Sequence, residues 1–282
     1  MKKNLIVFGK SNLIASQTIS FLKKKHYVKS YSSKECNLLN RKETSRVFKN
    51  LKKKYILIIF SSITKKKDCK KNFLKNLKMI QNIISSLNLK KIIKIIYISS
   101  VEVYGQNPDL PITEKTLINP RNLYGLAKFV SEQYLRLEVE SNKLLVLRLP
   151  GYYGYGDMHQ SVIGKFIKSA IYNKKIFINS SGKELRDFLF VNDFPTILNN
   201  LISQNVSGVI NVVSGNYSNI LSIAKYISKL FKNINIYKKK STEKYSKYIF
   251  LINKKIKDKS LYKFTNVKVG IKNYLNSLEI KK

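Results

Sequence analysis

The first half of the chain alternates short apolar runs with longer stretches that mix apolar and Lys-rich polar positions. The runs are continuous and rich in Ile, Val and Leu, which is typical of strands buried on both faces of a sheet. They predict strands at 4–8, 27–31, 56–60, 92–98 and 144–149. The stretches between them predict helices at 14–25, 42–53, 69–87 and 124–141. This alternation indicates an α/β fold with a doubly wound parallel sheet.

The pattern changes after Pro150, where Gly and Tyr cluster in the stretch PGYYGYGD. A helix is predicted at 162–173, followed by the short runs KIFINSSG and RDFLFVNDF and by a second alternating stretch at 208–231. A Lys-rich segment near 238–248 is predicted to be a loosely ordered loop. We therefore expect a large domain at 1–150 and a smaller C-terminal α/β lobe at 151–282, interleaved as one continuous unit.

The formal charge of +38 raises the question of nucleic-acid binding, because clustered Lys and Arg are the usual footprint of phosphate contacts. The basic residues, however, are almost all Lys, and they are spread along the whole chain. Readers of base edges rely on Arg, which is scarce here. We attribute the charge to an AT-rich coding bias and expect no nucleic-acid partner, although weak attraction of anionic ligands still follows.

Cys36 and Cys69 are the two cysteines, and they show no metal-ligand spacing, so free thiols in a reducing cytoplasm are expected. The apolar run after Met1 ends within about five residues at Gly9 and has no cleavage pattern of a signal peptide. No segment reaches the roughly 18 apolar residues of a membrane helix. The sequence predicts a cytoplasmic protein without a metal or a membrane partner.

The loop after the first strand, Gly9-Lys10-Ser11, looks like the end of a phosphate-binding P-loop. A P-loop also needs a glycine five positions earlier, where this chain has Asn4, so that interpretation is rejected. A dinucleotide-binding loop fits better, with Asn12 and Ala15 in place of its second and third glycines. Asn tolerates positive φ, and Ala still permits close packing of helix on strand. The predicted cofactor contacts are Gly9, Lys10, Ser11, Asn12, Leu13 and Ile14, with the helix N-terminus facing a pyrophosphate.

The second predicted strand is followed by Ser32, Ser33 and Lys34, where dinucleotide-binding proteins commonly place an acidic residue that grips the adenosine ribose. A missing carboxylate with a nearby Lys suits the 2′-phosphate of NADP. We therefore expect Ser33 and Lys34 to contact the cofactor, and we favour NADP over NAD.

Three further stretches belong together: YISSVEVYG, then PITEKTLINPRNLYGLAKFVSEQY with Tyr124-x-x-x-Lys128, and then LRLPGYYGYGD. With them the chain resembles the NAD-dependent epimerase/dehydratase family, the extended short-chain dehydrogenases that act on nucleotide sugars. The Gly-basic loop and the CNLLN turn at 36–40 resemble the dTDP-4-dehydrorhamnose reductase and GDP-fucose synthase branch. The resemblance covers essentially the whole chain, and it implies a Rossmann-type sheet and a substrate-binding lobe.

Tyr124 and Lys128 lie four residues apart, so their side chains leave one face of a helix. A phenol with a pKa near 10 is a poor base at neutral pH, and an adjacent ammonium should lower that pKa. The resemblance implies that Lys128 also holds the nicotinamide ribose and that Ser100 binds the reacting sugar oxygen. It further implies that Tyr124 moves a proton while hydride passes between the sugar and the nicotinamide. The predicted catalytic residues are Ser100, Tyr124 and Lys128.

The resemblance adds five further positions. Ser61 and Ser62 stand where relatives line the cofactor with alanines, and Asn76 matches an Asn on the cofactor side, although a helix-surface role remains open. Arg186 matches a residue that contacts the substrate diphosphate, although an ion pair with Asp187 or Asp193 is an alternative. Gly151 replaces a common substrate-binding Asn.

The reaction type depends on the residues between Ser100 and Tyr124. The 4,6-dehydratases carry two carboxylates there, whereas this chain has Val101 and Glu102, so we count Glu102 with the substrate contacts. The features favour reduction of a 4-keto nucleotide sugar, with a 4-epimerase holding NAD tightly as the alternative and a non-catalytic relative as a third reading. Relatives also suggest a homodimer formed through the helices predicted at 69–87 and 124–141.

Overall fold

The computed structural model describes residues 1–49, 51–64, 68–106, 108–157, 161–238, 249–250 and 264–278. Its largest sheet has six strands in the order β2-β1-β3-β4-β5-β9, and every neighbouring pair is parallel. The strands are β1 (Asn4–Phe8), β2 (Tyr27–Tyr31), β3 (Tyr55–Ile59), β4 (Ile92–Ser100), β5 (Leu144–Leu149) and β9 (Gly208–Asn211). This doubly wound arrangement confirms the predicted fold class.

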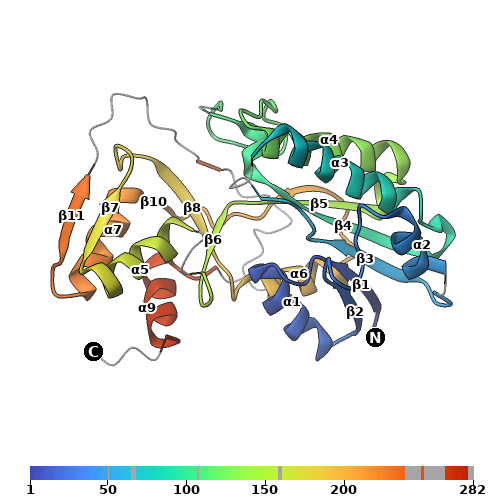
Figure 1. The fold of residues 1–282 in the computed structure, drawn as a ribbon, viewed down its shortest axis with the longest axis horizontal. Coiled ribbons are helices and arrows are strands. Elements are labelled where there is room, and N and C mark those ends of the chain that lie inside the picture. Colours follow the sequence, from blue (N-terminus) through green and yellow to red (C-terminus); the bar gives the residue numbers. More distant parts are fainter. Residues whose placement is uncertain are drawn as a thin grey trace.

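Helices cover both faces of the large sheet (Figure 1). One face carries α1 (Leu13–Lys23) and α6 (Phe194–Ser203), and the other carries α2 (Arg41–Lys49), α3 (Lys70–Ile84) and α4 (Leu123–Glu138). Successive β1 residues feed opposite cores: Leu5 and Val7 pack with α1 and α6, whereas Ile6 and Phe8 pack toward α2. Two apolar layers therefore hold the sheet, as the continuous apolar runs predict.

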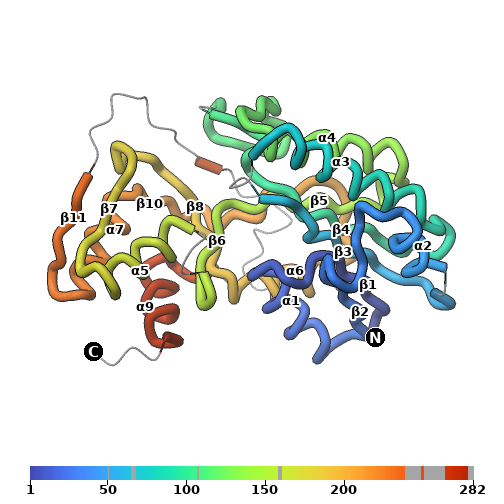
Figure 2. Tube along the Cα trace, viewed as in Figure 1, coloured from blue at the N-terminus to red at the C-terminus, as the bar shows by residue number. Residues whose placement is uncertain are grey.

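A smaller lobe follows β5 and contains two short sheets, one with the order β10-β8-β6 and one that pairs β11 with β7. Its strands are β6 (Gly151–Tyr153), β7 (Lys175–Ile178), β8 (Leu185–Phe190), β10 (Tyr217–Asn219) and β11 (Asn235–Lys238). Its helices are α5 (Val162–Asn173), α7 (Ile220–Leu230) and α9 (Val267–Asn276). Figure 2 shows that the chain returns from this lobe to place α6 beside α1.

The predicted elements match the observed ones except at their ends. β4 extends to Ser100 and passes into a short 3₁₀ helix, η3 (Val101–Tyr104), and two further 3₁₀ turns, η2 (Leu89–Lys91) and η4 (Ser141–Lys143), flank β4 and β5. The Lys-rich segment near 238–248 lies outside the described residues from position 239 on. In the described part of the chain, no helix is long and apolar enough to span a bilayer.

Candidate functional site

Gly9 leaves β1 with φ +94°, a conformation that favours glycine. A Cβ there would lie 2.6 Å from the backbone nitrogen of Ser61, so no other residue fits between β1 and the end of β3. The amides of Gly9 and Lys10 both donate to the carbonyl oxygen of Tyr31 on β2. The loop is therefore pressed against the ends of both neighbouring strands, as a dinucleotide loop requires.

Asn12 plays a different part from the one predicted for it. Its φ is −77°, so its tolerance of positive φ is not used. Instead its side chain is the N-cap of α1: Oδ1 accepts from the amide of Ile14 at 3.0 Å and from the Tyr152 hydroxyl at 3.2 Å. The amide of Ile14, a predicted cofactor contact, is thereby occupied inside the protein. Ala15 is fully buried under the sheet, in line with its predicted packing role.

The end of β2 carries a carboxylate that sequence reasoning missed. Glu35 folds back on the turn and accepts from the amide and hydroxyl of Ser32 at 2.8 and 2.7 Å. It also pairs with Lys10 at 2.5 Å, and these contacts, led by Lys10, lower the pKa of Glu35 to about 2. An ionised carboxylate therefore stands beside the glycine loop, although its residue comes four positions after β2.

A cavity of about 420 Å³ opens between this turn, the glycine loop and the segment after β3. The predicted cofactor contacts that line it are Gly9, Ser11, Asn12, Ser33, Ser61 and Ser62. Lys10, Leu13, Ile14 and Lys34 are not among its lining residues, and Lys34 is exposed to solvent. Buried Cys36 also faces the cavity, and burial raises the pKa of its thiol. The lining mixes serine, asparagine and glycine with apolar side chains such as Phe8 and Phe60. It lies at the carboxyl ends of β1, β2 and β3, where doubly wound sheets bind dinucleotides.

The three predicted catalytic side chains come together at the end of β4. The hydroxyls of Ser100 and Ser62 lie within reach of the Tyr124 hydroxyl and act to lower its pKa. Lys128 donates from Nζ to the carbonyl oxygen of Ile98 at 2.7 Å, and Nζ lies 5.8 Å from the Tyr124 ring centroid. A small space bounded by Ser61, Ser62, Asn76 and Lys128 adjoins them.

The first turn of α4, which carries Tyr124, is held by three side chains. Asn122 caps the helix through the amide of Gly125, and Asp68 accepts from the amides of Leu123 and Tyr124 at 3.3 and 2.8 Å. Glu102 in turn accepts from the Asn122 side chain at 2.9 Å. The backbone of Tyr124 is thus fixed at once from Asp68, which precedes α3, and from Glu102 on η3.

Burial governs the acidity of this site. Burial raises the pKa of Tyr124, and the neighbouring Tyr152 and Glu102 raise it further. Burial also lowers the pKa of Lys128 to about 7, while the charge of Glu132 acts in the opposite direction. The expected lowering of the phenol pKa by Lys128 is therefore not seen in this structure, and Tyr124 is a protonated phenol at neutral pH.

The remaining predicted residues lie in two places. Asn76 is buried and binds both the amide and the carbonyl of Ile63, so it supports the segment that contains Ser61 and Ser62. Gly151 and Arg186 lie in the small lobe, on the paired strands β6 and β8. The carboxylates of Asp187 and Asp193 accept from Ser214 with Gly215 and from Thr265, respectively. Contact of Asn76, Gly151 or Arg186 with a ligand stays a prediction.

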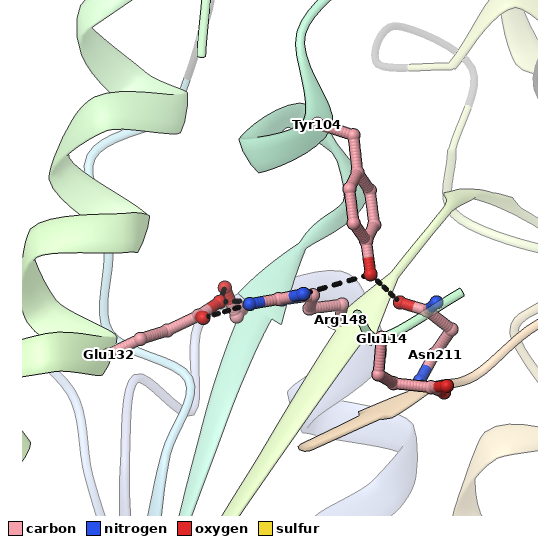
Figure 3. A network of polar contacts seen from close by, with 6 residues as sticks. Tyr104, Glu114, Glu132, Arg148 and Asn211 are labelled. Carbon is pink, nitrogen blue, oxygen red and sulfur yellow. Dashed lines mark hydrogen bonds and ion pairs between the residues drawn. The ribbon is translucent and has the colours of Figure 1, made fainter. Parts of the chain in front are cut away.

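A buried polar network behind the site was also missed (Figure 3). Arg148 on β5 forms a bidentate pair with Glu132 on α4, at 3.1 and 2.6 Å, and both side chains are almost fully buried. Arg148 also donates to the Tyr104 hydroxyl, which donates to Asn211 on β9. One signal could have revealed it: Arg148 is the single charged residue in the otherwise apolar run LLVLRL.

Among the described residues, no three His, Cys, Asp or Glu side chains are placed to hold a metal ion. The glycine loop and the cavity at the carboxyl ends of β1, β2 and β3 are compatible with a dinucleotide. Contact of a cofactor with Gly9, Ser11, Asn12, Ser33, Ser62, Tyr124 and Lys128 stays a prediction.

The chain is similar in sequence to enzymes of nucleotide sugars. The chain is 28% identical over 156 residues to dTDP-D-glucose 4,6-dehydratase of Homo sapiens, a match covering 54% of this chain and 45% of that protein. It is 28% identical over 208 residues to ADP-L-glycero-D-manno-heptose-6-epimerase of Brachyspira hyodysenteriae, covering 68% of this chain and 65% of that protein. The matched part thus spans less than half of the human protein.

Solved structures share the fold over the whole chain. RMD from Pseudomonas aeruginosa, complexed with NADPH, superposes with a TM-score of 0.84 at 21% identity over 99% of both chains. UDP-N-acetylglucosamine 4-epimerase from Methanobrevibacter ruminantium gives a TM-score of 0.84 at 19% identity, also over 99% of both chains. The model of the NAD dependent epimerase/dehydratase family matches residues 5–214 of this chain. These residues contain the glycine loop, Ser100, Tyr124 and Lys128. The chain therefore belongs to the NAD dependent epimerase/dehydratase family.

Proposed function

We propose that this protein is an NAD(P)-dependent oxidoreductase that reduces the 4-keto group of a nucleotide sugar. The observation that carries the proposal is the meeting of Ser100, Tyr124 and Lys128 at the end of β4, beside a cavity that fits a dinucleotide. Membership in a family that contains nucleotide-sugar enzymes supplies the substrate class.

The side chains have separate tasks in this proposal. Bound nicotinamide dinucleotide would supply the hydride. The Ser100 hydroxyl donates to the keto oxygen and orients it, and Tyr124 gives that oxygen its proton. The Lys128 ammonium stabilises the phenolate that the transfer leaves behind. A phenol whose pKa is raised by burial is protonated at neutral pH, which suits a proton donor.

Glu102 supports reduction over dehydration. Its carboxylate holds Asn122 and thereby the start of α4, and the neighbouring position is Val101. The pair of carboxylates that the common 4,6-dehydratase mechanism uses is therefore absent from this position.

A 4-epimerase is the second candidate, and Glu35 is the observation that favours it. Its carboxylate lies beside the end of β2, where it suits the free ribose hydroxyls of NAD. Lys10 and Lys34 instead supply positive charge for the 2′-phosphate of NADP. We propose NADP as the cofactor of the reductase and NAD as that of the epimerase.

Replacing Tyr124 with Phe tests the catalytic assignment. Loss of the proton donor should lower kcat at least about 100-fold with a 4-keto nucleotide sugar. NADPH binding, measured by fluorescence titration, should change by less than about threefold, because the ring remains in place. Tyr172→Phe, at an exposed position on α5, is the matched control. Full activity of Tyr124→Phe would overturn the mechanism.

We also propose a homodimer. The groove between α3 and α4 measures about 580 Å³ and is lined mainly by Leu39, Leu74, Leu77, Ile80, Val130 and Tyr134. A second copy would bury this apolar surface. The cytoplasmic location inferred from the two free thiols stays a prediction.

A further inference from the structure

Three side chains of α4 bind three consecutive residues of β4. Tyr124, Lys128 and Glu132 are spaced four residues apart and so share one face of the helix. Tyr124 meets the Ser100 hydroxyl, Lys128 donates to the Ile98 carbonyl, and Glu132 accepts from the Ser99 hydroxyl. The helix that carries Tyr124 and Lys128 is therefore attached to the strand that carries Ser100, the third candidate catalytic residue.

Glu132 is the best anchored of the three. Its two carboxylate oxygens accept hydrogen bonds from Nε and Nη2 of Arg148. Ser99, Arg148 and Asn211 are register partners across β4, β5 and β9, so they form one row beneath α4. Such a bidentate, buried pair fixes both the position and the charge of its members.

The row continues beyond the ion pair (Figure 3). The Arg148 guanidinium lies 5.0 Å from the Tyr104 ring centroid and donates to its hydroxyl at 2.8 Å. Tyr104 donates to the Asn211 side-chain oxygen, and the backbone amide of Asn211 donates to the Glu114 carboxylate at 2.7 Å. The carboxylate of Glu132 is thus held in a frame that reaches from α4 to β9.

We propose that Glu132 is a positioning residue for the candidate site, which anchors the face of α4 that carries Tyr124 and Lys128 to β4. This inference rests on the function proposed for Lys128. The Lys128 ammonium faces the rings of Tyr97 on β4 and Tyr124 on α4, and Glu132, one helical turn further along α4, acts on it through its charge. Those facing Glu132 are Arg148 on β5, Ser99 and Tyr97 on β4, and Lys128 itself. Glu132 is therefore the one anionic group among these neighbours.

The sign of the effect follows from linkage. Burial lowers the pKa of Lys128 to about 7, below the value of the unfolded chain. The folded protein therefore releases this proton first, and its stability rises with pH from about 7 toward 10.5. Removing the charge of Glu132 lowers the pKa of Lys128 further, so that this rise begins at a lower pH.

The experiment measures urea unfolding between pH 5 and 9 for wild type and Glu132→Gln, each also in a Lys128→Met background. The difference between backgrounds isolates Lys128. We expect the pH at which the Lys128-dependent stability begins to rise to be about one unit lower in Glu132→Gln than in wild type. This corresponds to a tenfold change in proton affinity. The falling limb of kcat against pH should move by the same amount.

Two variants guard against a purely structural effect. Glu132→Gln/Arg148→Met removes both charges and avoids an unpaired buried Arg, and it should show a shift of the same sign. Asp193→Asn loosens Thr265 in the small lobe and should cost stability without moving the onset. An unchanged onset in both Glu132 variants, or an equal shift in Asp193→Asn, overturns the inference.

The two proposals can fail separately. A shifted onset in a protein without turnover would sink the proposed function and leave the role of Glu132 intact. Turnover with an unshifted onset would do the opposite.

Discussion

Glu35 is the residue that should decide between the two nicotinamide dinucleotides. Its ionised carboxylate lies at the end of β2 and shares Lys10, and a ribose 2′-phosphate placed there would meet a like charge. We expect Glu35→Gln to tighten NADPH binding relative to NADH by about tenfold, because the like charge beside the 2′-phosphate is removed. Fluorescence titration of both cofactors measures the ratio.

A control for Glu35 is Glu43, a half-buried residue on α2 whose carboxylate also accepts from a backbone amide, that of Asn37. Glu43→Gln should leave the NADPH to NADH ratio unchanged. If Glu35→Gln does not change the ratio either, the carboxylate has no contact with the adenosine ribose.

Predictability at this scale depended on spacing. Tyr124 and Lys128 could be singled out because their helical spacing of four is visible in the sequence, and Ser100 because the stretch YISSVEVYG resembles the family. Glu35 could not, because its carboxylate reaches the end of β2 only through the turn at 32–35. The role of Asn12 was misread because its side chain, and not its backbone, makes the loop. The raised pKa of Tyr124 depends on burial, which no local pattern reports.

The close packing of η3 on α4 requires a residue without a side chain at position 125. A Cβ at Gly125 would lie 2.7 Å from the carbonyl oxygen of Glu102, a backbone atom that cannot turn aside. Gly125→Ala should therefore separate the two elements and destabilise the protein by about 1–3 kcal/mol, despite the better helix propensity of Ala. Urea unfolding measures the cost, and turnover should fall because Ser100 precedes η3.

Gly151→Ala is the matched stability control, since the nearest atom to its new Cβ would be 4.0 Å away. Equal unfolding free energies for the two variants would show that η3 yields without cost.

Element boundaries were less predictable than element types. Apolar runs marked β1, β3, β4 and β5, because these strands are largely buried on both faces. The edge strand β2 is only partly buried. The extension of β4 to Ser100 could not be foreseen, because Ser99 and Ser100 are polar and are held by partners on α4. The predicted strand at 144–149 contained Arg148, but its ion pair could not be foreseen, because its partner Glu132 lies sixteen residues earlier on another element.

At the scale of the molecule, the groove between α3 and α4 is suited to a second copy. We expect the wild type to sediment as a dimer at micromolar concentration, because stable interfaces bury about 1,200–2,000 Å² and α3 and α4 offer two long helices. Leu74→Lys places a charge on this surface, where Leu74 is 54% exposed, and should yield monomers. Leu117→Lys, at a loop position that is 75% exposed, should not. A monomeric wild type would refute the dimer.

The last strand of the large sheet also bears on how the protein is made. β9 is the neighbour of β5, yet residues 150–207 separate them in the chain. At about 5–20 residues per second, a ribosome needs roughly 3–12 s to bridge that gap. Throughout that time β5 has an unpaired edge, and Leu145 and Leu147 lack the cover of α6. The nascent chain thus passes through an aggregation-prone stage, when a chaperone could bind this edge. A lower growth temperature would favour recovery of the folded protein.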